Sequence, residues 1–188
     1  ASVTVGGNVS ISAGASATLD QNSTLDVGGN LSISGSLTMS SIASPASRLE
    51  VVGDLSTSAT AVITPGAGMT TFKGAVNATI TLGHTSDTDF NDITFSKATG
   101  NTVTLASTSA QMDVAGSITM SGAAATSKFI AAGTMVVSGA VTGSAGTLKI
   151  DGTTTVRGSM TGEWSLEFAA TGSPLLIFEG IDLNPTGT

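Results

Sequence analysis

The segment from His84 to Asp92 (H-T-S-D-T-D-F-N-D) holds the densest group of side chains able to do chemistry. Asp87, Asp89 and Asp92 supply carboxylate oxygens, and His84 is the only histidine of the chain. Calcium takes several oxygen ligands from short loops of this kind, but the segment lacks the Gly and the closing Glu of an EF-hand loop. Two interpretations therefore stay open: a solvated corner with no cofactor, and a structural calcium site at Asp87, Asp89 and Asp92.

Residues suited to catalysis are sparse. One His and no Cys give no support for a Ser-His-Asp triad or a Cys-His pair. Glu163 and Glu167 have the type of a glycosidase pair, but only Trp164 accompanies them in the expected strand. The six Lys and Arg residues are scattered, and the net charge of −7 disfavours a track for nucleic-acid phosphates. We therefore expect a protein that is not an enzyme and does not bind nucleic acid.

The elements that would position these residues are visible in the stretch from Leu25 to Leu37. Apolar side chains alternate with polar ones there, and Gly29 and Gly35 fall on the apolar parity. Strict alternation predicts extended chain with one buried face. A Gly at an inward position has no side chain to pack and can adopt the angles of a bend. The pattern predicts three short strands joined by two glycine corners.

The same frame recurs along the chain around six further glycines: Gly7, Gly53, Gly74, Gly116, Gly133 and Gly152. Segments of variable length separate the copies, which is typical of a parallel β-solenoid. We expect an all-β, single-domain parallel β-solenoid of about eight irregular coils, with a β-sandwich as the alternative. Residues 1–160 would form the repeat region, and residues 161–188 would form divergent C-terminal strands at an assembly contact.

The two near-duplicates around Gly7 and Gly29 each place an Asn directly after the glycine pair. Asn8 and Asn30 would stack at one corner, because Asn favours turns and stacked amides can bond along the axis. Asn8, Asn22, Asn30 and Asn77 also begin Asn-x-Ser or Asn-x-Thr sequons. A corner ladder and glycosylation of these four residues both remain open. Asp26 and Glu50 share one frame position, where we expect Arg48 to offset their repulsion.

Several stretches resemble a known class of protein. F-N-D-I-T-F from Phe90, G-N-T-V-T-L from Gly100 and V-A-G-S-I-T-M from Val114 are similar to the right-handed β-helix repeats of large secreted bacterial surface and adhesin-like proteins. A second resemblance is to subunits of bacterial or archaeal sheaths and surface layers. Both cover about residues 1–160 and imply a fold and an extracellular setting, without a defined activity.

Composition is compatible with that setting. Apolar residues are dispersed singly, so no run approaches the length of a membrane-spanning helix. The chain begins at Ala1, which suits either a secreted protein whose leader was removed or an excerpt of a longer one. We expect an extracellular or cell-surface location.

The two ends of the solenoid suggest how it would be used. No charged side chain precedes Asp20, and the stretch around Leu176, Ile177 and Phe178 is strongly apolar. Open strand edges template pairing with another chain. We therefore expect a structural subunit that joins end to end through Val3 and Val5 on one side and Leu176, Ile177 and Phe178 on the other, giving an extracellular filament, sheath or surface layer. The alternative is a stalk segment of an adhesin, for which the partner is a cell-surface polysaccharide or receptor.

Overall fold

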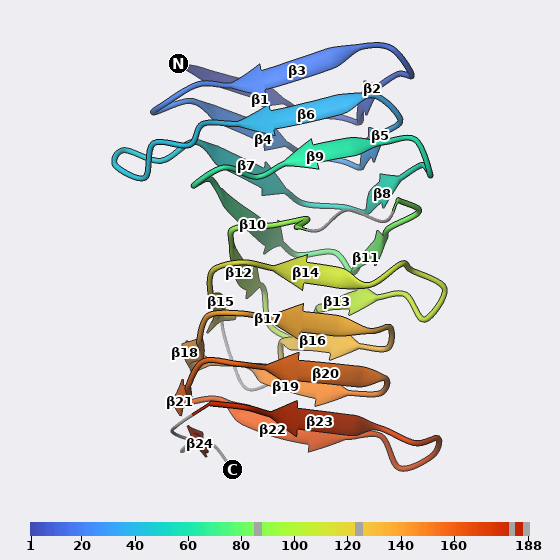
Figure 1. The fold of residues 1–188 in the computed structure, drawn as a ribbon, viewed down its shortest axis with the longest axis vertical. Coiled ribbons are helices and arrows are strands. Elements are labelled where there is room, and N and C mark those ends of the chain that lie inside the picture. The colour runs from blue at the N-terminus through green and yellow to red at the C-terminus, as the bar shows by residue number, and fades with distance from the viewer. Residues whose placement is uncertain (85–87, 123–125, 181–182, 186–188) are drawn as a thin grey trace.

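A computed structural model describes residues 1–84, 88–122, 126–180 and 183–185. Residues 183–185 are described by their backbone alone. These residues contain strands and no helix, and the strands pair in parallel as a solenoid of about seven turns (Figure 1). The parallel pairing confirms the expected solenoid and excludes the β-sandwich, whose sheets are antiparallel.

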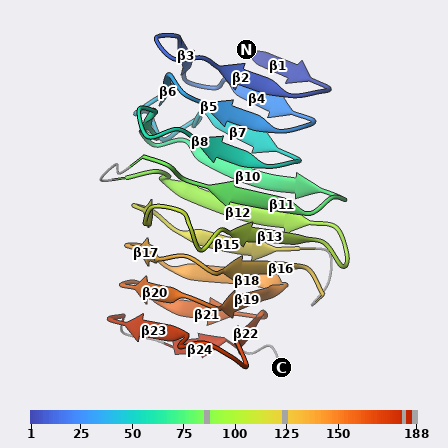
Figure 2. The same ribbon diagram turned by 90° about the vertical axis from the view of Figure 1, so that its right-hand side faces the viewer.

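Each coil places one strand on each of up to three sides. Within the described residues, the first side is a nine-stranded sheet: β1 (Ser2–Val5), β4 (Thr24–Val27), β7 (Arg48–Val51), β10 (Met69–Gly74), β12 (Asp92–Lys97), β15 (Ile118–Ser121), β18 (Val141–Ala145), β21 (Met160–Gly162) and β24 (Leu183–Pro185). The second side is eight-stranded: β2 (Val9–Ile11), β5 (Leu31–Ile33), β8 (Leu55–Thr57), β11 (Ala78–Thr81), β13 (Thr102–Leu105), β16 (Lys128–Ala131), β19 (Thr147–Ile150) and β22 (Ser165–Phe168). Figure 2 shows these two sides along the whole stack.

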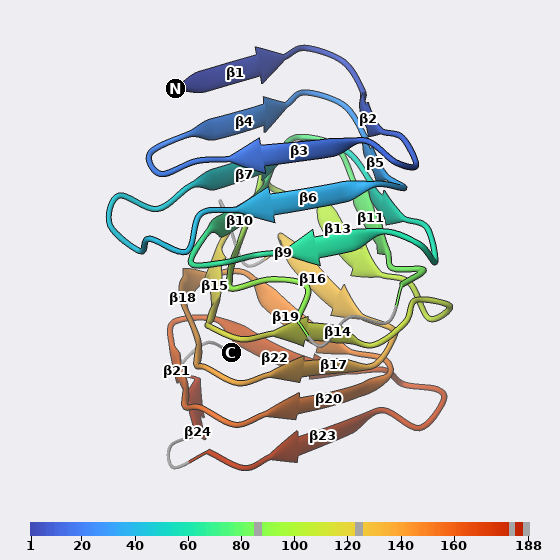
Figure 3. The same cartoon turned by 45° about the horizontal axis from the view of Figure 1, so that its top comes forward.

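The third side is divided into two sheets. The first sheet contains β3 (Ser16–Leu19), β6 (Ser36–Met39) and β9 (Val62–Thr64), and the second contains β14 (Met112–Val114), β17 (Met135–Val137), β20 (Thr153–Val156) and β23 (Leu175–Phe178). The division falls in the fourth coil, where the described part of residues 82–91 contains only an isolated bridge between Phe90 and Val114 (Figure 3). The described residues of the densest polar cluster therefore lie where the third side changes sheet.

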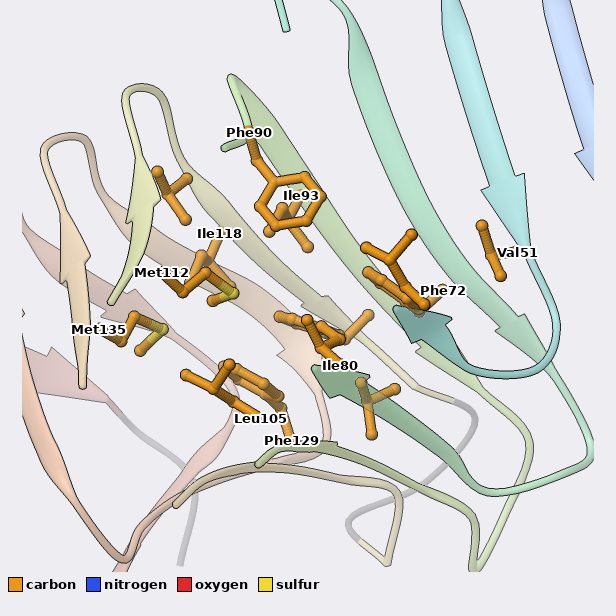
Figure 4. Packing of buried hydrophobic residues seen from close by; sticks show 14 of the residues in the cluster. Val51, Phe72, Ile80, Phe90, Ile93, Leu105, Met112, Ile118, Phe129 and Met135 are labelled. Carbon is orange, nitrogen blue, oxygen red and sulfur yellow. The ribbon is translucent and has the colours of Figure 1, made fainter. Parts of the chain in front are cut away.

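The core consists of columns of inward side chains that continue from coil to coil. Strand register places Val27 beside Val51 and Val51 beside Phe72, and all three are fully buried. Phe95 follows in the same column and stacks on Phe129 of the second side, with ring centroids 3.9 Å apart (Figure 4 shows this part of the core). Apolar burial of this kind is the main favourable term in folding.

Most corner glycines of the frame serve close stacking rather than unusual backbone angles. The positive-φ glycines do not include Gly29, Gly35, Gly133 or Gly152. A Cβ built on Gly152 would instead stand 2.5 Å from the carbonyl oxygens of both Ala132 and Gly133 in the preceding coil. Contact with fixed backbone cannot be relieved by moving a side chain, so glycine is needed where one coil crosses closely over another.

The glycine frame occurs at all three kinds of corner. Gly29 joins the first side to the second, Gly133 joins the second to the third, and Gly116 joins the third to the first. In the fourth coil the frame around Gly74 places Val76 on the inward parity, two residues after the glycine. This expectation is wrong, because the Val76 side chain is 49% exposed. Gly74 there has a φ of 85°, and the residues after it leave the strand, so the alternation restarts at buried Ala78.

Outward columns bring like charges together and supply a counter-ion. Asp26 and Glu50 are register partners on the first side, as expected. The balancing cation is Lys73, whose Nζ lies 3.0 Å from an Asp26 carboxylate oxygen and 2.5 Å from one of Glu50. The expected role of Arg48 is therefore taken by Lys73, which stands in the following coil. Its bonds to these two carboxylates raise the pKa of Lys73.

Replacing Gly152 by Ala tests the stacking constraint. Because the added Cβ would press on two backbone oxygens, we expect Gly152→Ala to lower the free energy of unfolding by about 1–3 kcal/mol, the usual cost of overpacking. Gly7→Ala is the control, since a Cβ there meets nothing within 4 Å. Urea unfolding of dilute protein measures both, and equal losses would contradict the explanation.

Candidate functional site

The histidine is buried in the fourth coil between a hydroxyl and a carboxylate. His84 Nδ1 lies 2.6 Å from Thr57 Oγ1 of the preceding coil, and Nε2 lies 2.8 Å from Asp89 Oδ1. When Asp89 is ionised, its carboxylate only accepts, so the proton on Nε2 faces Oδ1 and Nδ1 accepts from the Thr57 hydroxyl. Thr57 Oγ1 also accepts a hydrogen bond from the Gly83 N–H at 2.9 Å. The Nε2–Oδ1 contact has an ion-pair distance but not the alignment of a hydrogen bond.

Asp89 is fixed from its other side by the following coil. Its Oδ2 accepts the Asp113 N–H at 2.9 Å, and its own N–H donates to the Asp113 carbonyl at 3.0 Å. Burial raises the pKa of Asp89, and the nearby Asp113 carboxylate adds to this. The Asp113 N–H and His84 act in the opposite direction and lower it. Thr57, His84 and Asp89 thus connect three successive coils across the place where the third side changes sheet.

These three groups have the composition of a nucleophilic relay but not its accessibility. Thr57, His84 and Asp89 are 8%, 3% and 1% exposed, so the hydroxyl has no open approach for a substrate. Thr57 could not be identified as the partner of His84 from the sequence, because it lies 27 residues before the histidine. Its only signal was an inward position in the glycine frame, where a polar residue must find a buried partner.

The described residues give little support to the hypothesis of a calcium site. Asp89 and Asp92 do not converge: Asp92 Oδ1 accepts the Ser117 N–H at 2.8 Å, and Oδ2 accepts from Asn91 Nδ2 at 3.1 Å. Asp87, the third expected ligand, lies outside the described residues. No group of three His, Cys, Asp or Glu able to hold a metal occurs in the part of the chain that the structure describes.

A second buried polar group lies at the corner after β12. Lys97 is 2% exposed, and its Nζ donates to the carbonyl oxygens of Val52 at 2.5 Å and Lys73 at 2.7 Å. Burial lowers the pKa of Lys97 to about 8, partly offset by Asp54. Lys97 also borders a small pocket whose other lining residues are Phe95, Met120, Gly122, Ser127 and Lys128. With its amine bonded to two carbonyls, Lys97 satisfies backbone acceptors from two earlier coils.

The acidic pair of the C-terminal region does not form a paired site. Glu167 binds Lys128 with Oε2 2.8 Å from Nζ, whereas Glu163 is exposed before β22. Trp164, between them in sequence, is 1% exposed and donates from Nε1 to the Thr161 carbonyl at 2.8 Å. The tryptophan therefore fills the core of the last coils and lines no cleft beside the two acids.

Asparagines at the first corner belong to a ladder that runs through the first four coils. Asn8 Oδ1 accepts the Asn30 N–H, and Asn30 Oδ1 accepts the Asp54 N–H, each at 2.9 Å. Asp54 continues the ladder by accepting the Thr79 N–H at 2.7 Å. The expected stacking is confirmed, with one difference. Each side-chain oxygen accepts from a backbone N–H of the next coil rather than from the side-chain amide of the next asparagine.

The four sequon asparagines thus occupy two settings. Asn77 accepts the Thr102 N–H at 2.9 Å, in the same manner as Asn8 and Asn30. Asn22 differs: it lies in an exposed turn with a φ of 57°, and its carbonyl accepts from the Ala1 amino group. Glycosylation at these positions stays a prediction, and Asn22 is the member of the four whose side chain is outside this ladder.

The residues expected at the assembly contact lie in the end coils. Val3 is 56% exposed although its register partner Leu25 is buried, and Val5 is partly buried. At the other end, Leu176 and Phe178 pack against the core and Ile177 faces outward at 40% exposure. β22, β23 and β24 pair with β19, β20 and β21, so strands of residues 161–188 extend the existing sheets.

One end residue was missed from the sequence. Phe168 is the register partner of buried Ile150, yet it is 49% exposed because it belongs to the last strand of the second side. Alternation alone would have placed Phe168 inward. Only the strand order shows that no described strand lies beyond it.

No protein-family model, curated protein or solved structure matches this chain. The described residues contain no helix that is long and apolar enough to cross a membrane.

Thermal unfolding of the protein tests the calcium hypothesis. Because Asp89 and Asp92 already accept backbone N–H groups, we expect excess calcium or EDTA to leave the Tm unchanged. A ligand that binds only the folded state raises stability by mass action. A Tm that rises with calcium concentration and returns with EDTA would establish the site and implicate Asp87.

The buried carboxyl of Asp89 predicts how the stability of the fold changes with pH. Its raised pKa means that folded Asp89 keeps its proton to higher pH than the unfolded chain does, so stability is lost as pH rises from about 4 through the folded pKa. Asp89→Asn removes this loss. We expect the variant to gain stability relative to the wild type between pH 4 and pH 7 in urea titrations. Exposed Asp20→Asn is the control, and parallel profiles for all three proteins would contradict the assignment.

Proposed function

We propose that this protein is a structural subunit that polymerises end to end, at an extracellular or cell-surface location, as part of a filament, sheath or surface layer. The partner is a second copy of the chain, and we propose no catalytic role and no bound cofactor. The observation that supports the proposal most strongly is the exposure of inward-facing apolar side chains at both ends of one continuous core.

The two ends expose side chains at positions that are buried in the interior coils. Val3 and Phe168 are 56% and 49% exposed, while their register partners Leu25 and Ile150 are 9% and 0% exposed. Their exposure follows from the lack of a covering coil among the described residues. A second copy stacked in the same direction would bury both sets, which is the main driving force for association.

The backbone of the first coil is also suited to a neighbour. A Cβ on Gly28 would stand 3.0 Å from the Gly6 carbonyl oxygen, and one on Gly29 would press on Gly7 and Asn8. Gly6 and Gly7 hold the same places one coil earlier, where an added Cβ would meet nothing within 4 Å. The first coil thus keeps the small corner residues that a closely stacked coil on its open side would require.

Parallel strands make the proposed contact directional. The first coil offers a free edge of β1, and the stack ends at its other pole in β22, β23 and β24 (Figures 1 and 3). A contact between two different surfaces of identical subunits does not close on itself and propagates as a fibre or tube. Strand-edge addition is an established mode of recognition for such surfaces.

The alternative is a stalk segment of a cell-surface adhesin. The same open ends would then be covered by further coils, and any polysaccharide or receptor would be bound elsewhere. The two functions differ in the behaviour of this chain alone, since a subunit polymerises and a stalk segment stays monomeric.

The experiment compares single lysine substitutions at matched positions. We expect the wild type to form polymers visible by electron microscopy and sedimentation, and Val3→Lys or Phe168→Lys to prevent them, because a lysine at an inward end position would be buried without a partner. Val62→Lys is the control: Val62 is 52% exposed but lies on the lateral surface, in β9.

The outcomes separate the candidates. A wild type that remains monomeric would favour the stalk segment. Polymers that survive Val3→Lys and Phe168→Lys but not Val62→Lys would place the contact on the lateral surface instead.

A further inference from the structure

The strand counts of the three sides are unequal at the C-terminal end. The first side ends with β24 as its ninth described strand, whereas the second side ends with its eighth, β22. Successive register partners, from Val3 and Leu25 through Val141 and Met160 to Leu183, lie in one column of the first side. Leu183 therefore has the same column position as Val3, and Asn184 has the same position as Thr4.

This inequality creates a conflict in an end-to-end stack. If β2 of an incoming copy pairs with β22, then β1 of that copy falls on the next position of the first side, beside β21. That position is already occupied by β24, which pairs with β21 through Met160 and Leu183. If β1 were instead added beyond β24, one strand position on the second side would stay empty and Phe168 would stay uncovered. Both strands cannot be accommodated.

We propose that β24 occupies the docking position of the β1 strand of the next copy, and that it must leave β21 before two copies can join. The inference rests on the proposed function and specifies its contact. β24 is then a protective edge strand that limits assembly, and the incoming β1 replaces it.

The pairing properties of the two strands favour this exchange. β1 is four residues long, Ser2 to Val5, and contains no proline, so each of its residues has an N–H to donate. β24 pairs over three residues and includes Pro185, which has no N–H to donate. Proline on an edge strand is a common means of preventing further pairing. The shorter strand, with fewer donors, is the one expected to leave.

The positions that the exchange would bring together are compatible in type. Val3 would take the place beside Met160, which is fully buried, and Thr4 would take the place beside Thr161. On the second side, the column that contains Val9 and Leu31 also ends in Phe168, so Val9 would cover this exposed ring. No charged residue of the incoming β1 or β2 enters these columns.

Engineered cysteines test the exchange in the full-length protein, which has no cysteine of its own. Thr161 and Asn184 are register partners, and paired strands lie about 4.8 Å apart, within the range of a disulfide. In Thr161→Cys/Asn184→Cys, oxidation would lock β24 on β21. We expect loss of polymer in the oxidised protein and recovery to the wild-type amount after reduction. The reduced sample is the control for any effect of the substitutions themselves.

Two further double variants report which strands meet in the polymer. Thr4→Cys/Thr161→Cys should give disulfide-linked multimers on oxidation, because the incoming β1 would lie beside β21. Thr4→Cys/Asn184→Cys should give none, since β24 would have left. Within one molecule these cysteines stand at opposite ends of the stack, so any link must join two copies.

Each result has one interpretation. Polymerisation of the oxidised lock variant, or cross-linking through positions 4 and 184, overturns the exchange while end-to-end stacking stands. Polymers in which neither pair cross-links overturn end-to-end stacking as well. If neither the wild type nor the reduced Thr161→Cys/Asn184→Cys variant polymerises, the proposed function itself is refuted.

Discussion

Each paired strand residue of this solenoid lies about 4.8 Å from its register partner in the next coil, because parallel strands hold that spacing. The remaining features follow from this constraint. At Gly152 the crossing leaves no space for a Cβ, and along the first side Val27, Val51 and Phe72 form one uninterrupted apolar column. The same spacing places Asp26 beside Glu50, so Lys73 is needed at the point where the two carboxylates meet.

The buried ionisable side chains of the described residues lie where the regular stacking is interrupted. Thr57, His84 and Asp89 connect three coils at the change of sheet on the third side, and Lys97 binds the carbonyls of Val52 and Lys73 at a corner. Each group binds backbone N–H or carbonyl groups that have no partner in the strand ladder. Burial is costly for an ionisable group, as the raised pKa of Asp89 and the lowered pKa of Lys97 show. These residues are best understood as structural substitutes for ladder hydrogen bonds.

Sequence periodicity predicted the solenoid because alternation and glycine corners repeat in every coil. It could not assign each copy to a side, since the same sequence pattern surrounds Gly29, Gly116 and Gly133, which lie at three different corners. Nor could it find Thr57 or Lys73 as partners, because contacts between coils depend on the length of the variable segments. Phe168 was missed for a similar reason: its exposure depends on strand order at the end of the stack. Local pattern determines parity, whereas register between distant segments determines the sites.

The asparagine ladder has a consequence for the order in which the protein folds. Each side-chain oxygen belongs to the earlier coil and each N–H to the later one, from Asn8 through Asn30 to Asp54 and Thr79. A finished coil therefore presents acceptors to the segment that follows it in the chain. During synthesis the N-terminal coils emerge first, so each new coil meets a template that is already complete. Strand partners in neighbouring coils are about one coil apart in the chain, so a new coil needs only the coil before it as a partner. The ladder thus favours folding in chain order over the first four coils, because each completed coil presents an acceptor to the coil that follows it.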